Sequence, residues 1–196
     1  MSKNMTVEKT FASAIQNHQK NNFKAAEDLY NQILEIDPNH IKTIFFLGTL
    51  SVQTKNFDRA KQMLQKTIQA QPNNVDAYNN LGVVFKEFEE FQKAKDCFEK
   101  VIQIQPKHVD ALNNLGNVFK QLNEPQKAIN YYQKAIEIEP SYINAHQNLM
   151  DVCEKTNQIT ELKDAVSNAR TFFKDNSIIK LYEGILLSRN EKFVEA

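Results

Sequence analysis

The feature that most constrains this sequence is a set of four prolines placed at one constant interval. Pro38, Pro72, Pro106 and Pro140 follow one another at the same distance, since 72−38, 106−72 and 140−106 are all 34. A fixed period of about 34 residues is typical of a chain built from stacked helical repeats. Such a chain offers a long shared surface, so we expect its function to be binding and not catalysis by a compact cluster.

Apolar side chains follow the same period. With each proline at position 32 of a repeat, five repeats begin at Val7, Ile41, Val75, Val109 and Ile143. In the first four repeats, position 8 carries a small residue and position 24 a large one, namely Ala14 and Tyr30, Gly48 and Leu64, Gly82 and Phe98, and Gly116 and Tyr132. Small residues let two helices approach and large residues fill the space between them, so this alternation predicts stacked antiparallel helix pairs.

Local signals indicate where these helices begin and end. Polar residues such as Asn56 and Asn123 are expected to cap the second helix of a repeat, because their side chains can accept hydrogen bonds from unpaired backbone N–H groups. The residue before a proline avoids helical geometry, so each second helix is expected to end before the repeating proline. Pro125 lies near the start of a second helix, where a missing N–H is tolerated.

The repeats divide the chain into a predicted series of units. We expect a flexible tail over residues 1–6, five repeats over 7–40, 41–74, 75–108, 109–142 and 143–176, and a truncated sixth repeat over 177–196. The fifth repeat carries Met150 and Leu162 at two small positions, which predicts altered packing without loss of the fold. The sixth is expected to stop inside its second helix, at Ala196, without a polar cap. This suggests either a fragment of a longer protein or an end that a partner covers.

Two stretches carry a resemblance to a known family. LGVVFKEFEEFQKAKDCFEKVIQIQP (residues 81–106) and LGNVFKQLNEPQKAINYYQKAIEIEP (residues 115–140) resemble the tetratricopeptide repeat pattern. The resemblance covers residues 7–176 and implies an all-α, right-handed superhelical solenoid of stacked antiparallel helix pairs, with first helices lining the concave side. The third and fourth repeats are also similar to those of the O-linked N-acetylglucosamine transferases.

Composition narrows the function further. Lys+Arg and Asp+Glu are both 24, so the net charge is +0, and a nucleic-acid partner is not expected. No apolar stretch has the length of a signal peptide or a membrane span, so we expect a cytoplasmic protein without a membrane partner. Histidines, cysteines and carboxylates show no catalytic or metal-binding spacing, which predicts neither an enzyme nor a cofactor.

Positions of the first helices that packing does not use are the candidate partner-binding residues. These are Asp76, Asn79, Asn80, Lys86, Asp110, Asn113, Asn114, Asn117, Lys120 and Asn148, together with Phe45 and Phe46. Asn80, Asn114 and Asn148 form a ladder with the repeat's period. Their amides could pair with the backbone of an extended peptide, or they could bond to adjacent helices and hold the stack in register. Both interpretations stay open.

Phe45 and Phe46 occupy positions that asparagines hold in later repeats. We expect one ring to pack against a neighbouring helix and the other to offer an apolar anchor to a partner. The predicted function is a protein-interaction scaffold that binds a peptide or helix of another protein in its concave groove. The alternatives are a substrate-recruiting domain of a larger glycosyl-, sulfo- or methyltransferase, and self-association through the uncapped C-terminal end.

Overall fold

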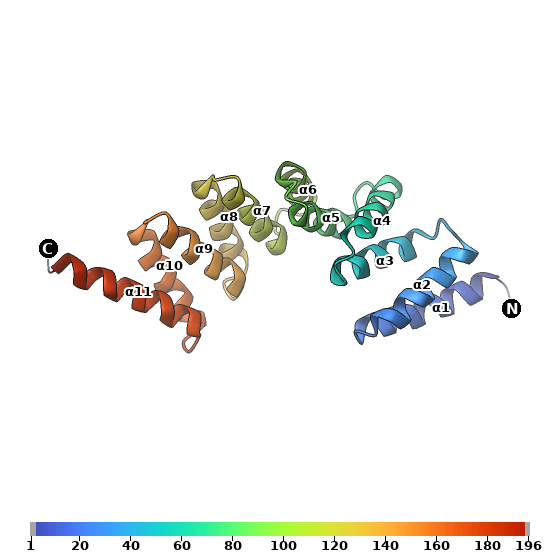
Figure 1. Cartoon of the computed structure of the whole chain (residues 1–196), viewed down its shortest axis with the longest axis horizontal. Helices are drawn as coiled ribbons and strands as arrows, with labels where there is room; N and C mark the ends of the chain where they lie inside the picture. The colour runs from blue at the N-terminus through green and yellow to red at the C-terminus, as the bar shows by residue number, and fades with distance from the viewer. Residues whose placement is uncertain (1–2, 195–196) are drawn as a thin grey trace. The chain divides into compact units, whose positions relative to one another are not determined.

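The computed structural model describes residues 3–194, and these residues form α-helices with no β-strand among them (Figure 1). In chain order the helices are α1 (Lys3–Gln19), α2 (Phe23–Ile36), α3 (Ile41–Gln53), α4 (Phe57–Ala70), α5 (Val75–Glu87), α6 (Phe91–Ile104), α7 (Val109–Gln121), α8 (Pro125–Ile138), α9 (Ile143–Lys155), α10 (Ile159–Phe172) and α11 (Ser177–Val194). Odd-numbered helices are the first helices of the repeats and α2, α4, α6, α8 and α10 are the second helices. The all-α repeat fold expected from the sequence is confirmed.

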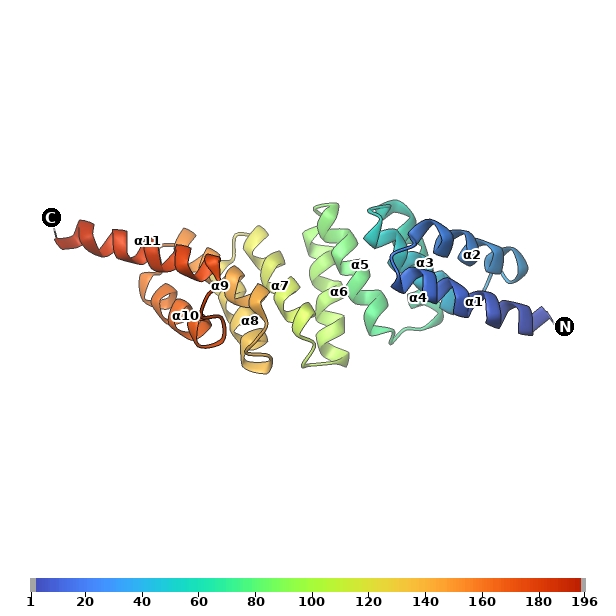
Figure 2. The ribbon, with the colours of Figure 1, turned by 90° about the horizontal axis from the view of Figure 1, so that it is seen from below.

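The helices form two compact halves, residues 1–104 with α1–α6 and residues 105–196 with α7–α11, and each half is described by itself. Within each half every helix packs against the next one along the chain, as α5 with α6 and α7 with α8 show in both views (Figures 1 and 2). First helices of successive repeats also touch, since α3 contacts α5 in the N-terminal half and α7 contacts α9 in the C-terminal half. Each half therefore carries a face made of adjacent first helices.

The turn between the two helices of each repeat has one recurring geometry. Its residue with a left-handed backbone lies at Asn21, Lys55, Glu89, Asn123 and Asn157, with φ between 57° and 60°. The next residue donates its N–H to a carbonyl five positions back, as Glu90 does to Phe85 at 2.9 Å, and so satisfies a carbonyl at the helix end. The expectation that Asn123 caps the following helix is wrong, because Asn123 is this left-handed residue and Glu124 precedes the helix. Asn56 does cap α4, by accepting from the Arg59 N–H.

The core of a repeat is built on a close approach between a glycine and a large side chain. Gly82 faces the ring of Phe98, and a methyl group added to Gly82 would lie 2.7 Å from that ring. Gly116 faces Tyr132 in the same way, at 2.5 Å. Both rings are fully buried, so each fills the space that the missing side chain leaves.

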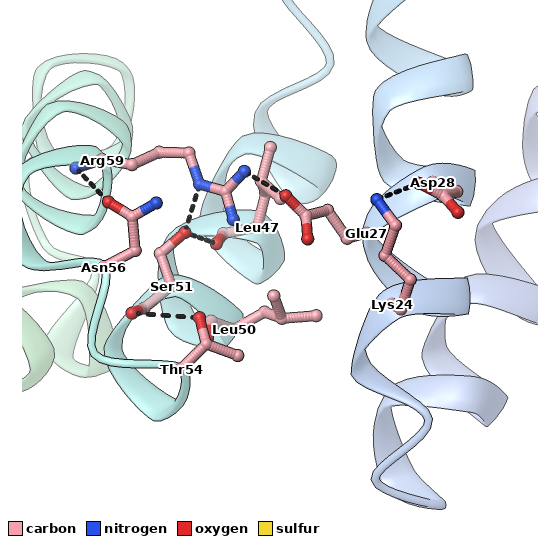
Figure 3. Close-up of polar contacts among 9 residues, drawn as sticks. All are labelled: Lys24, Glu27, Asp28, Leu47, Leu50, Ser51, Thr54, Asn56 and Arg59. Atoms are coloured by element: carbon pink, nitrogen blue, oxygen red, sulfur yellow. Dashed lines mark hydrogen bonds and ion pairs between the residues drawn. The ribbon is translucent and has the colours of Figure 1, made fainter.

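Polar contacts add to this packing in the N-terminal half (Figure 3). Arg59 of α4 donates from Nε to Ser51 Oγ of α3 at 2.8 Å, and its guanidinium forms an ion pair with Glu27 of α2. Ser51 in turn donates to the carbonyl of Leu47 at 2.7 Å. One half-buried arginine thus joins three helices of two successive repeats.

The structure corrects both ends of the predicted series. The tail expected over residues 1–6 is helical from Lys3 onward, because α1 begins there and not at Val7. The sixth repeat was expected to turn into a second helix near Phe193, but α11 runs as one helix through Val194. Ala196, where the expected second helix would have stopped, lies outside the described residues. The fifth repeat keeps its two helices, with Met150 and Leu162 fully buried.

Candidate partner-binding surface

In the N-terminal half, the candidate surface is the face shared by α3 and α5. Asn80 of α5 donates from its side-chain amide to Thr49 Oγ1 of α3 at 3.1 Å, so it joins two first helices. Phe46 turns inward, where its ring lies 5.7 Å from Phe11 and 6.4 Å from Tyr30. Phe45 is half-buried, and its ring contacts Phe46 edge-on at 5.2 Å. Both rings are half-buried, but Phe46 packs against the core cluster of its half, whereas the ring contact of Phe45 among the described residues is with Phe46.

In the C-terminal half, polar side chains join α7 and α9. Asn148 of α9 donates to the side-chain oxygen of Asn113 of α7 at 2.9 Å, and Asn113 is buried. Lys120 of α7 lies 3.2 Å from Asp151 of α9, which also pairs with Lys155 at 2.9 Å. Partial burial alone would raise the pKa of Asp151, but the hydrogen bonds from the two lysines outweigh it and hold this pKa below its usual range.

Two more candidate residues bond to tyrosines of the same half. Asn117 accepts from the hydroxyl of Tyr132 at 2.8 Å, which ties α7 to its own second helix. Asp110 accepts from the hydroxyl of Tyr142 at 2.6 Å. Burial and this bond to Asp110 raise the pKa of Tyr142 to about 12, so its hydroxyl stays protonated and remains a donor at neutral pH.

Four candidate residues have weaker contacts or none with their own half. Asp76 is exposed and Asn114 is half-buried, and neither forms a hydrogen bond or ion pair in the described part of the chain. Lys86 has only a 3.8 Å contact with its neighbour Glu87. The amide oxygen of Asn79 is buried and accepts no hydrogen bond from the described residues. These four are the candidate polar groups that the repeats themselves do not fully use.

Three histidines have structural roles that the sequence analysis did not assign. His40 and His108 directly precede α3 and α7. The Nδ1 atom of each accepts a hydrogen bond from the backbone N–H three residues later, which is that of Thr43 for His40 and that of Ala111 for His108. His18 is buried and joins three helices, with Nε2 2.8 Å from the Gln53 side-chain oxygen and Nδ1 3.1 Å from the Tyr30 hydroxyl. The place of His40 and His108 directly before a helix start is the signal that could have identified the first two as caps.

The described residues contain neither a metal-binding cluster nor a membrane-spanning helix. No three histidine, cysteine, aspartate or glutamate side chains gather there closely enough to hold a metal ion. Every described helix also falls short of the length and apolar character that a membrane span requires.

Comparison with solved structures finds proteins of the same architecture. The crystal structure of MamA protein is 26% identical, with a TM-score of 0.76 over 86% of this chain and 92% of that chain. PilF of Pseudomonas aeruginosa is 18% identical, with a TM-score of 0.80 over 96% of this chain and 86% of that chain. YrrB, described as a tetratricopeptide-repeat protein with an unusual peptide-binding site, is 16% identical, with a TM-score of 0.75 over 94% of this chain and 98% of that chain.

Family comparison gives the same result from sequence. No curated protein gives a significant match to the chain. The tetratricopeptide repeat family matches residues 18–82, 75–108 and 109–142, which together span residues 18–142 and so more than half of the chain. Helix pairs that recur at the repeat period, the glycine-to-ring packing within them and these matches agree, and the chain belongs to the tetratricopeptide repeat family.

Proposed function

We propose that this chain is a protein-interaction scaffold and that Phe45, on the first-helix face of the N-terminal half, binds an apolar side chain of a partner protein. The observation that carries the proposal is the different placement of Phe45 and Phe46. Phe46 is held among Phe11, His18 and Tyr30, and the edge-on contact with Phe46 gives the Phe45 ring a rigid support. Aromatic residues held rigidly at a surface are the ones that contribute most to protein binding.

Polar groups beside Phe45 suit an extended segment. Asn80 uses one amide hydrogen for Thr49, and its carbonyl oxygen remains an acceptor for a backbone N–H of the partner. Thr49 donates its hydroxyl to the carbonyl of Phe45, which fixes the position of this pair on α3. A ring with an amide next to it favours a segment that offers an apolar side chain and an unpaired peptide group. YrrB, which has the same architecture, is described as having a peptide-binding site, and this supports a peptide as the ligand proposed here.

The test compares the two neighbouring phenylalanines. A partner is captured from extract of the native organism with the wild-type chain, purified, and titrated against Phe45→Ala and Phe46→Ala. Phe45→Ala is expected to weaken binding by about tenfold or more and to lower the thermal midpoint less than Phe46→Ala does, because the Phe45 ring has fewer ring contacts with its own half. Phe46→Ala is expected to lower the midpoint, because it removes a ring that packs against the core cluster.

Unchanged affinity of the Phe45→Ala variant for the purified partner would contradict the proposal. A loss of affinity that appears only with Phe46→Ala, together with loss of stability, would mean that the fold and not the Phe45 ring is needed. A substrate-recruiting role for an attached transferase would use the same face, and the captured partner would then be an acceptor protein of that enzyme.

A second candidate function, self-association, rests on α11. The glycine at position 8 of the repeat faces a large side chain at Gly48, Gly82 and Gly116, whereas no packing neighbour among the described residues lies within 4 Å of a methyl group added to Gly184. Leu181 and Leu187 of the same helix are 61% and 64% exposed. Phe85 of α5 and Phe119 of α7 occupy the same repeat position as Leu187, and both are buried. A second copy of the chain could cover this apolar face of α11.

A further inference from the structure

The C-terminal half has a groove on its other side, between the second helices α8 and α10. Its volume is about 380 Å³, and it is lined by side chains of α8, α9 and α10. Ile136, Leu149 and Ala165 form its apolar floor, and Glu137, Glu161 and Asp164 are the exposed carboxylates around it. The groove shares no residue with the first-helix face considered above.

The groove is hollow because one side chain is small. Position 23 of the repeat carries Leu29, Met63, Cys97 and Tyr131 in the first four repeats, but Ala165 in the fifth. Tyr131 fills its place in α8 by stacking on Phe119 of α7 at 5.3 Å. Alanine reaches no further than its methyl group, so the space above it stays open between α8 and α10.

The groove is acidic because the fifth repeat also reverses the charge at a nearby position. Position 19 is Arg59, Lys93 and Lys127 in the second, third and fourth repeats, but Glu161 in the fifth. Position 26 is Lys66, Lys100 and Lys134 in those repeats, but Asn168 in the fifth. No cation is among the lining residues, and Glu137, Glu161 and Asp164 form no ion pair within the described residues.

From this geometry we infer that the α8–α10 groove is a second docking site, which takes a short basic amphipathic segment of a partner protein. An apolar side chain of the segment sits on Ile136, Leu149 and Ala165, and its lysines or arginines lie against Glu137, Glu161 and Asp164. The volume suits a few side chains and not a folded domain. Charge complementarity selects a basic partner, since an acidic one would bring like charges together.

The carboxylate of Glu161 already affects a buried neighbour. Burial, and after it the negative charge of Glu161, together raise the pKa of the Cys153 thiol to about 11. Glu161 itself forms no ion pair within the described residues. A cation of a partner would supply the missing compensation.

The test uses a labelled, amidated peptide of roughly 14 residues, made of leucine and lysine at helical amphipathic spacing. Binding to the full chain is followed by fluorescence anisotropy. The test variant Glu161→Lys/Asp164→Asn places on α10 the residues that α8 carries at the same positions, Lys127 and Asn130. The affinity of this variant for the peptide is expected to fall by about tenfold or more, because the charge attraction is lost. The wild-type affinity is expected to fall as NaCl rises from about 50 to about 300 mM.

A matched control is Asp58→Lys/Glu35→Gln in the N-terminal half. It makes the same change in net charge, and Asp58, like Glu161, is an acidic residue in the first turn of a second helix. The control is expected to bind the peptide like the wild type. When the wild-type chain is titrated with the peptide, the changes in backbone amide NMR chemical shift are expected to concentrate in α8 and α10. Equal binding by the test and control variants, equal binding of a leucine–glutamate peptide, or shifts elsewhere would overturn the inference. Phe45→Ala is expected to leave this binding unchanged, which separates it from the function proposed above.

Discussion

At the scale of single residues, the glycines of the first helices have two different environments. Gly116 lies against the fully buried ring of Tyr132, whose hydroxyl is fixed by Asn117. Gly184 lies in open space in α11. Neither has a positive φ, so an added methyl group meets no backbone strain at either site. The chemistry of the substitution is the same at both, and only the neighbouring side chain differs.

Gly116→Ala is therefore expected to destabilise the protein by about 1–2 kcal/mol, because overpacking against Tyr132 outweighs the better helix propensity of alanine. Gly184→Ala is expected to stabilise it by up to about 1 kcal/mol, because only the propensity gain remains. Urea unfolding followed by circular dichroism measures both. Equal effects of the two variants would show that the Tyr132 ring moves aside freely.

His146 is a buried residue with an expected pH dependence. Its Nε2 donates to the carbonyl of Pro140 at 2.9 Å, and its Nδ1 is buried without a partner among the described residues. Burial lowers the pKa of His146, and the hydrogen bond to the Pro140 carbonyl only partly opposes this. The unfolded chain then binds a proton more readily than the folded one, so stability is expected to fall as the pH falls below about 6.5.

The His146→Leu variant, which places on α9 the residue that α7 carries as Leu112, is expected to flatten this dependence. Its slope of unfolding free energy between pH 7 and pH 5 should be smaller than that of the wild type, by no more than about 1.4 kcal/mol per pH unit. Comparing the two slopes by urea unfolding removes the contribution of the other histidines. Parallel slopes would show that His146 is not the source.

At the scale of elements, the helix pair depends on one left-handed residue in its turn. Three of the five turns place asparagine there, at residues 21, 123 and 157, and the other two place Lys55 and Glu89. Asparagine adopts this conformation more readily than lysine or glutamate, because its short polar side chain bonds locally. The turn geometry is therefore the same in all repeats, while its conformational strain is larger in the second and third.

Glu89→Gly is expected to stabilise the protein by about 0.5–1 kcal/mol, since glycine relieves the left-handed strain but adds entropy to the unfolded chain. Asn123→Gly in the fourth repeat is the matched control and is expected to change stability much less. Thermal unfolding of both variants beside the wild type makes the comparison. A destabilised Glu89→Gly variant would mean that the Glu89 side chain has a stabilising role that outweighs its backbone strain.

At the scale of the whole molecule, stability comes from contacts between helices that follow one another, which is typical of repeat proteins. The face of α11 that bears Leu181, Gly184 and Leu187 lacks such a neighbour within the described residues. If a second copy covers this face, sedimentation velocity is expected to show a concentration-dependent dimer. Leu187→Glu should abolish the dimer because it places a charge in the apolar contact.

A matched control for that experiment is Thr171→Glu, an equally charged change at an exposed position of α10. It should leave the dimer unchanged. A monomer at all concentrations for the wild-type chain would rule out self-association through α11. Both variants test the surface alone, because neither residue is part of the buried core.

The sequence alone determined the all-α repeat fold and the alternation of small and large residues at its packing positions, such as Gly82 and Phe98. These follow from short-range signals repeated with one period, which makes each signal several times stronger. The repeating proline is not required to end a second helix, since α10 ends at Phe172 although Lys174 takes the place of proline in this repeat.

Only the tertiary structure decided how the surface side chains are used. The side chains of Asn80, Asn113 and Asn148 form hydrogen bonds between first helices. Asn114 occupies the same repeat position as Asn80, but it forms no such hydrogen bond among the described residues of its half. Phe46 packs against the core cluster and Phe45 packs on the Phe46 ring, although they are neighbours of one residue type. The groove beside Ala165 exists because α10 carries only a methyl group at this position. Such outcomes depend on side chains some 30 positions away, whose geometry no local pattern carries.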